Sequence, residues 1–250
     1  MRYAAVGDSY SEGLGDELPD GTMRGWTDLV AAGLAAELAE QVDYANFAVR
    51  GRLLDPIVRD QLEAALSLSP APTLITLNGG GNDMLRPGTD VPRLIGLIER
   101  ALRRAAEAGI PLAVVSGADP SDRLPFGAMM RRRGELLTEA TRKLADEHGA
   151  TLIDVFHDEE IRKAAYWAPD RLHLNTAGHQ RVAGLVLAGL GYDRAAHVVD
   201  PAPAESRRVL AEARYYREHV LPWVNRRLRG RSSGDNLTGK HVTWTPVPAA

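Results

Sequence analysis

Short apolar runs alternate along the chain with longer stretches whose apolar residues recur at helical spacing. The short runs predict buried strands over residues 3–6, 42–49, 73–77, 111–116 and 151–156. The helical spacing predicts helices over 25–40, 56–66, 90–108 and 129–148, and a last one from Asn175 or Thr176 to about Leu190. Five alternations of strand and helix favour a doubly wound parallel sheet with helices on both faces. We therefore predict a three-layer α/β/α sandwich with five parallel strands.

The pattern changes at about residue 191. Apolar residues recur at helical spacing over 207–229, and the region from Glu205 to Lys240 holds nine lysine or arginine residues against four acidic ones. We expect one α/β domain over 1–190 and a C-terminal extension over 191–250. The extension is predicted to pack a helix on the acidic domain and to end in a mobile tail.

Composition narrows the classes of function. Of the 250 residues, 44% are hydrophobic and 25% are charged, as in a soluble globular protein, and the net charge of −3 does not favour nucleic acid as a partner. The absence of cysteine excludes disulfides, thiolate metal sites and a cysteine nucleophile. No stretch is long and apolar enough for a membrane span, and Met1 leads directly into the first strand. We expect a cytoplasmic protein with no metal and no cofactor.

Three predicted strands are each followed by a turn that offers a chemically useful group. Ser9 follows the first strand, Gly51 the second and Asn82 the third. The carboxyl ends of parallel strands lie at one edge of the sheet, which is where such folds place their active sites. The Ser9 and Gly51 amides and the Asn82 side chain are therefore candidate donors of an oxyanion hole, and Gly51 lacks a Cβ that would obstruct its amide.

Asp170 and His173 lie just before the last predicted helix. Serine hydrolysis needs a hydroxyl that attacks, an imidazole that takes its proton, and a carboxylate that orients the imidazole. Asp170 is three residues before His173, close enough for a turn to bring the carboxylate and the ring together. Asp8 and Asp83 flank the candidate site, and we interpret both as structural acceptors for turn amides.

Four blocks of the sequence resemble the SGNH (GDSL) hydrolases. They are Gly7-Asp8-Ser9 with Gly13, Asn46 leading to Gly51, Gly80-Gly81-Asn82-Asp83, and Asp170-x-x-His173. The resemblance covers about 2–190 and implies a flavodoxin-like sheet. It implies Ser9 as nucleophile, His173 as general base and acid, Asp170 as its partner, and Ser9, Gly51 and Asn82 as the oxyanion hole. Tyr10 departs from the leucine that many members carry. The basic extension resembles that of actinobacterial members.

The resemblance fixes the chemistry more closely than the substrate, a small-molecule acyl ester. We predict a serine esterase that hydrolyses a short acyl or O-acetyl ester. A thioesterase or lysophospholipase for longer acyl chains is the alternative within the same chemistry, and acyl transfer to an alcohol uses the same acyl-enzyme. A binding protein that keeps the fold without catalysis is the alternative from another class, but no residue of the triad is missing.

Overall fold

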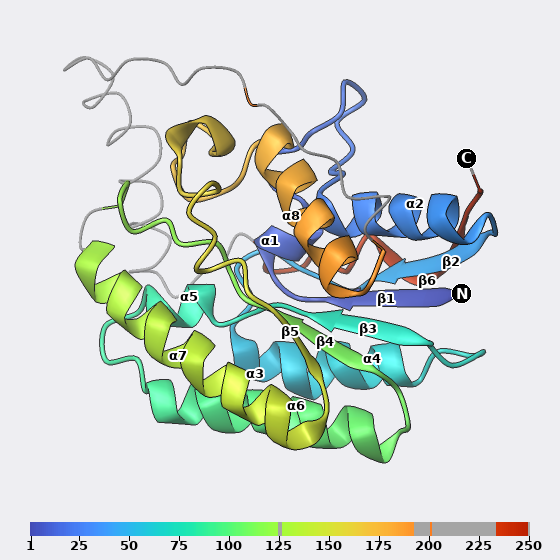
Figure 1. Cartoon of the computed structure of the whole chain (residues 1–250), viewed down its shortest axis with the longest axis horizontal. Helices are drawn as coiled ribbons and strands as arrows, with labels where there is room; N and C mark the ends of the chain where they lie inside the picture. The colour runs from blue at the N-terminus through green and yellow to red at the C-terminus, as the bar shows by residue number, and fades with distance from the viewer. Residues whose placement is uncertain (125–126, 193–200, 202–233, 250) are drawn as a thin grey trace.

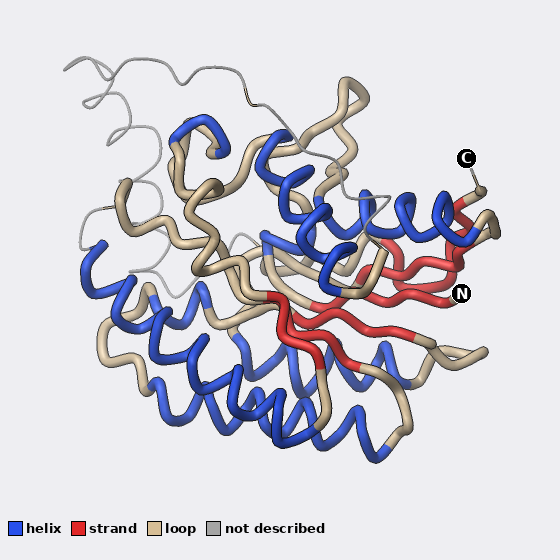
Figure 2. The backbone as a smooth tube through the Cα atoms, viewed as in Figure 1, coloured by secondary structure: helices blue, strands red, loops and turns tan. Residues whose placement is uncertain are grey.

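The computed structural model describes residues 1–124, 127–192, 201 and 234–249. Within these residues one sheet has the strand order β5-β4-β3-β1-β2-β6 (Figures 1 and 2). The strands are β1 (Arg2–Val6), β2 (Val42–Asn46), β3 (Leu74–Leu77), β4 (Leu112–Val115), β5 (Thr151–Ile153) and β6 (His241–Val247). The first five pair in parallel, and β6 pairs antiparallel with β2 at the edge of the sheet.

Helices cover both faces of this sheet (Figure 1). On one face lie α2 (Trp26–Leu38) and α8 (Thr176–Gly189). On the other lie α3 (Leu54–Pro56), the π-helical turn η1 (Ile57–Gln61), α4 (Leu62–Leu66), α6 (Val91–Glu107) and α7 (Gly127–His148). Three shorter helices, α1 (Ser9–Glu12), α5 (Gly81–Met84) and the 3₁₀ turn η2 (Ala164–Tyr166), belong to the connections. This is the predicted three-layer sandwich.

The core is divided between the two faces of the sheet. Successive residues of β1 point to opposite sides, as in any strand, so that Tyr3 and Ala5 pack under α2 and α8 while Ala4 and Val6 pack against α4 and α6. All four are completely buried. Burial on both faces explains why β1 is a continuous apolar run instead of an alternating one.

Two strands end earlier than the apolar pattern predicts, because side chains take over the hydrogen bonds. The Asn46 side-chain oxygen accepts from the Ala48 amide at 2.9 Å, and β2 ends there. The Ser116 hydroxyl accepts from the Val155 and Phe156 amides, both at 2.9 Å, and β5 ends at Ile153. In both places, the side-chain hydrogen bonds replace strand pairing and turn the chain away from the sheet at its carboxyl edge, where the connections lie.

The expectation of five strands and a mobile tail is wrong for 241–247, which form the sixth strand. The free edge of β2 carries unpaired amides and carbonyls, and β6 satisfies them. Trp244 packs against the α4 and α6 side of the core, Val247 packs against the α2 side, and the Trp244 indole donates to the Pro70 carbonyl at 3.0 Å. The helix predicted over 207–229 lies outside the described residues.

No helix in the described part of the chain has both the length and the apolar character that crossing a membrane requires. Groups of three or more histidine or acidic side chains suited to a metal ion were not found among the same residues.

Candidate active site

Ser9 is the first residue of α1, in the tight turn that follows β1. The carboxylate of Asp8 caps this helix, because its Oδ1 accepts from the Tyr10 amide at 3.0 Å. The Gly7 amide donates to the Gln61 side chain at 2.8 Å, which ties the turn to η1. A Cβ on Gly7 would lie 2.5 Å from the Ser11 hydroxyl. Only glycine therefore allows the turn to bend this closely before Ser9.

Asp170 and His173 lie in a loop that is closed by the bridge between Trp167 and Leu174. One carboxylate oxygen of Asp170 accepts from the amides of Leu172 and His173, both at 3.0 Å, an Asx turn that shapes the loop. The other oxygen, Oδ2, lies 2.5 Å from His173 Nδ1. This arrangement fixes the direction of the imidazole before any substrate binds.

The structure brings Ser9, His173 and Asp170 into one hydrogen-bonded chain. His173 Nε2 lies 3.0 Å from the Ser9 hydroxyl oxygen, although 164 residues separate them in sequence. The contact of Nδ1 with a carboxylate assigns the proton to Nδ1 and leaves the lone pair of Nε2 facing Ser9. Burial opposes ionisation of Asp170, but the hydrogen bond and the charge of His173 outweigh it, so that the pKa of Asp170 lies below its ordinary value.

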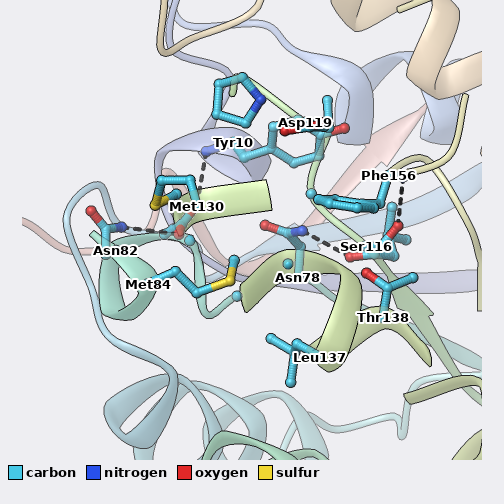
Figure 3. A pocket seen from close by; sticks show the side chains of 18 of the residues that line it. Tyr10, Asn78, Asn82, Met84, Ser116, Asp119, Met130, Leu137, Thr138 and Phe156 are labelled. Carbon is cyan, nitrogen blue, oxygen red and sulfur yellow. Dashed lines mark hydrogen bonds between the residues drawn. The ribbon is translucent and has the colours of Figure 1, made fainter. Parts of the chain in front are cut away.

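Asn82 lies in α5 and also faces the turn of Ser9 (Figure 3). Its Nδ2 donates to Asp8 Oδ2 at 3.0 Å and to the Arg52 carbonyl at 3.1 Å. Asp8 is 5% exposed, and burial raises the pKa of its carboxyl to about 6, partly opposed by the hydrogen bonds from Tyr10 and Asn82. Asp8 is thus an acceptor for turn amides, as predicted, and in addition the residue that orients Asn82.

Gly51 lies in the turn after β2 with a φ of 74°, in the left-handed region that favours glycine. The preceding residue is tied to α1, because the Arg50 amide and guanidinium both donate to the carboxylate of Glu12 at 2.6 and 2.5 Å. Among the described residues, Gly51 is not part of the lining of the pocket at Ser9. The structure therefore places the Gly51 turn beside α1 but not in the pocket wall.

A pocket opens beside Ser9 and His173 and continues towards α7 (Figure 3). Its cavity volume is about 120 Å³. Apolar side chains make up much of the lining, among them Met84, Val115, Met130, Leu137, Phe156 and Trp167. Ser9, Asn82 and His173 share the lining with other polar side chains, among them Asn78, Ser116 and Thr138. An apolar lining with a few polar groups is typical of a small-molecule site.

Sequence reasoning missed the residues that hold the site in place. Gln61 is 9% exposed and interrupts the apolar face of its helix. A polar residue at a predicted core position could have indicated a structural role for Gln61. Glu12, Arg50 and Lys240 carried no such signal, because charged residues at turns and near a chain end are ordinarily solvated.

Comparisons with known proteins identify the family and the fold of the chain. The GDSL-like lipase/acylhydrolase family matches residues 5–181. The lipase Lip_vut3 from a goat rumen metagenome is similar in structure, with a TM-score of 0.64 and 19% identity over 78% of this chain and 99% of that one. The psychrotrophic esterase EstA from Pseudoalteromonas sp. has a TM-score of 0.60 and 20% identity, over 76% of this chain and 96% of that one. A catalytic mutant of Axe2, an acetylxylan esterase from Geobacillus stearothermophilus, has a TM-score of 0.61 and 16% identity, over 82% of this chain and 97% of that one.

A comparison with curated protein sequences gave no significant match. The structural likenesses, all at low identity, establish the fold. The family match covers well over half of the chain and includes Ser9 and both residues of the loop before α8. The chain is therefore a carboxylic ester hydrolase that belongs to the GDSL-like lipase/acylhydrolase family.

Proposed function

We propose that the protein is a serine esterase that hydrolyses short acyl esters through an acyl-enzyme on Ser9. The observation that carries the proposal is the chain of hydrogen bonds from Asp170 through His173 to the Ser9 hydroxyl. Each residue has the chemical type and the partner that its role requires. The side chains of Asp170 and His173 are 28% and 19% exposed, so the site is open enough for substrate and for water.

In the proposed reaction the Ser9 oxygen attacks the acyl carbon while His173 Nε2 takes the hydroxyl proton. The tetrahedral intermediate collapses, and the alcohol leaves with that proton. Water then gives a proton to His173 and attacks the acyl-enzyme, and the carboxylic acid is released as Ser9 recovers its hydrogen. Asp170 stays ionised throughout and stabilises the imidazolium, in keeping with its lowered pKa.

The oxyanion hole in this proposal consists of the Ser9 amide, the Gly51 amide and the Asn82 side chain. Asn82 supports the assignment because Asp8 and Arg52 hold its amide beside Ser9. Since both hydrogens of Nδ2 already have acceptors, one of them must turn partly to the oxyanion as charge develops. The loss of one such donor typically raises the barrier by about 3 to 4 kcal/mol.

The size of the pocket supports a short acyl group. An apolar cavity of about 150 Å³ takes a benzene ring, so the volume of about 120 Å³ suits an acyl chain of up to about five carbons. The similarity in fold to an acetylxylan esterase is consistent with an O-acetyl group. The apolar wall favours the alternative, a thioesterase or lysophospholipase for longer chains, only if the cavity extends when ligand binds.

The test is hydrolysis of p-nitrophenyl esters from acetate to palmitate, with Ser9→Ala and Ser11→Ala measured in parallel. Ser11 is a matched control in the same helix, since its buried hydroxyl has no hydrogen-bond partner among the residues that the structure describes. We expect the highest kcat/KM between acetate and about pentanoate, loss of turnover in Ser9→Ala, and near-normal turnover in Ser11→Ala. A preference for long chains establishes the alternative, and no hydrolysis of any ester by folded protein contradicts the proposed function.

A further inference from the structure

Lys240 is a lysine whose ammonium is turned into the molecule. Its side chain is only 17% exposed. Nζ donates to the carbonyls of Glu12, Met23 and Arg24 at 2.9, 2.9 and 2.6 Å, and it forms an ion pair with Asp28 at 2.5 Å. An ammonium group has three hydrogens, so these four acceptors use all of its donor capacity.

These acceptors lie on the segment that carries the nucleophile. Glu12 is the last residue of α1, and Ser9 is the first, so Lys240 holds the carbonyl at the opposite end of a single helical turn. Met23 and Arg24 lead into α2, and Asp28 lies in its first turn. The ammonium therefore joins the end of α1 to the start of α2, from a residue that lies immediately before β6 in sequence.

The same part of the chain also lies against the turn of Gly51. A Cβ on Gly234 would lie 2.0 Å from the Arg50 carbonyl oxygen, and one on Gly239 would lie 2.4 Å from the Asn46 carbonyl oxygen. The backbone around β6 thus follows the chain from the end of β2 towards Gly51. Because Glu12 binds the Arg50 amide, α1, the Gly51 turn and residues 234–240 form one connected unit.

Holding an edge strand in place does not require a buried charge. Burying an ammonium works against folding unless hydrogen bonds and an opposite charge compensate it. Apolar contacts of Trp244 and Val247 and the pairing with β2 already fix β6. The directed contacts of Lys240 add something that apolar packing does not provide, a fixed position for the α1 carbonyl.

We propose that Lys240 is a positioning residue of the active site, which fixes α1 and so sets the hydroxyl and amide of Ser9 relative to the Gly51 turn. The proposal rests on the esterase function proposed above. Lys240 touches no reacting atom, and its effect passes through the Glu12 carbonyl. Small displacements of a reacting group lower the rate of the chemical step more than they lower substrate binding.

The first test replaces Lys240 by methionine, which keeps the length of the side chain and removes its donors. Lys143→Met is the matched control, since Lys143 is exposed on α7. We expect kcat to fall about tenfold in Lys240→Met, with KM within about twofold, and no change in Lys143→Met. Equal kcat per titrated Ser9 in Lys240→Met and wild type overturns the proposal, whatever happens to the melting temperature. Lys240→Gln carries the same test if the methionine variant does not fold.

The second test restores the missing cation from solution. Propylammonium added to Lys240→Ala should raise kcat severalfold, whereas propanol of similar size should not. Both rates are taken on one folded sample, so a general loss of stability does not produce the difference. An equal response to the amine and the alcohol, or no response to either, contradicts a role for the ammonium.

A third measurement separates this proposal from the proposed function. The rate at which a fluorophosphonate labels Ser9 depends on the nucleophile and its amide but needs no ester substrate. If the wild type hydrolyses no ester, the esterase function fails, yet labelling about tenfold slower in Lys240→Met than in wild type still supports positioning. Equal labelling rates in the two proteins contradict it.

Discussion

Two histidines lie six residues apart on either side of the start of α8, and they differ in every respect that matters for catalysis. His173 is partly exposed, with a carboxylate on Nδ1 and a serine hydroxyl at Nε2. His179 is completely buried; its Nδ1 accepts from the Trp26 amide at 3.2 Å, and its Nε2 lies 3.0 Å from the Leu14 carbonyl. The His173 ring forms hydrogen bonds with two side chains, whereas the hydrogen bonds of the His179 ring are with backbone atoms.

The difference shows what turns an imidazole into a base. Burial lowers the pKa of His179 to about 4, and the hydrogen bond to the Leu14 carbonyl and the charge of Asp16 offset only part of this effect. His179 therefore stays neutral and connects the turn after α1 to α8 and to the start of α2. In the proposed mechanism, His173 exchanges a proton with Ser9 because Asp170 stabilises its charged form.

The largest expected effect is on His173. We expect His173→Ala to lower kcat by about 100,000-fold, since Ser9 then has no base. The fold should be unaffected, because the side chain is at the mouth of the pocket and not in the core. Single-turnover and steady-state rates, with the circular dichroism spectrum as a control, check this. A loss of less than tenfold would assign the base to another residue.

Asp170→Asn should have the next largest effect, a fall in kcat of about 1,000- to 10,000-fold. The amide cannot stabilise the imidazolium, and it allows the ring to adopt the wrong tautomer. Asp154→Asn is a control of the same type, because Asp154 pairs with His157 outside the pocket. If both substitutions change kcat equally, the carboxylate at 170 has no special role.

His179 should affect stability instead of turnover. His179→Leu removes the partners of the Trp26 amide and the Leu14 carbonyl, and two orphaned buried groups together reduce the free energy of unfolding by about 3 to 5 kcal/mol. Urea denaturation measures this loss. We expect kcat per folded molecule within about twofold of the wild type, and a kcat as low as that of His173→Ala would erase the distinction between the two rings.

The pH dependence of stability gives the smallest and most selective effect. The raised pKa of Asp8 means that the folded state binds the proton more tightly, so stability falls as pH rises from 3.8 to about 6. The lowered pKa of His179 has the opposite effect, and stability falls as pH drops from 6.5 to about 4. Between about pH 4 and pH 6, the contributions of Asp8 and His179 to the free energy of unfolding therefore change in opposite directions.

Asp8→Asn should therefore uncover the contribution of His179. Relative to wild type, the free energy of unfolding of Asp8→Asn should rise by about 2 kcal/mol more between pH 4 and pH 6. Urea denaturation at half-unit intervals of pH gives the difference curve, in which groups common to both proteins cancel. A flat difference curve would show that Asp8 is already ionised at pH 4 in the folded protein.

The parts of the fold that follow from local pattern were predictable. Apolar runs gave five of the strands within a few residues, and Asn175, one of two candidate caps, is the residue that caps α8, with its side chain accepting from the Gly178 amide. Strand β6 was missed because Pro246 and its polar neighbours resemble a tail. Proline is tolerated there because the strand lies at the edge of the sheet.

The site residues were predictable because Ser9, Asp170 and His173 carry recognisable chemical groups at the ends of predicted elements. Their supports were not, since each acts through a partner far away in sequence. Gln61 reaches Gly7 from a π-helical turn, and the wider turn is not encoded in any simple periodicity. Lys240 meets Glu12 only after the sheet has assembled.

The position of β6 has a consequence for synthesis of the protein. Roughly 200 residues separate β2 from its antiparallel partner, so at 5 to 20 residues per second the edge of β2 waits about 10 to 40 seconds on the ribosome before β6 is made. During that interval the sheet ends in an open strand, which other nascent chains can pair with. Codon usage or chaperone supply that changes this interval should alter the yield of folded enzyme without altering its specific activity.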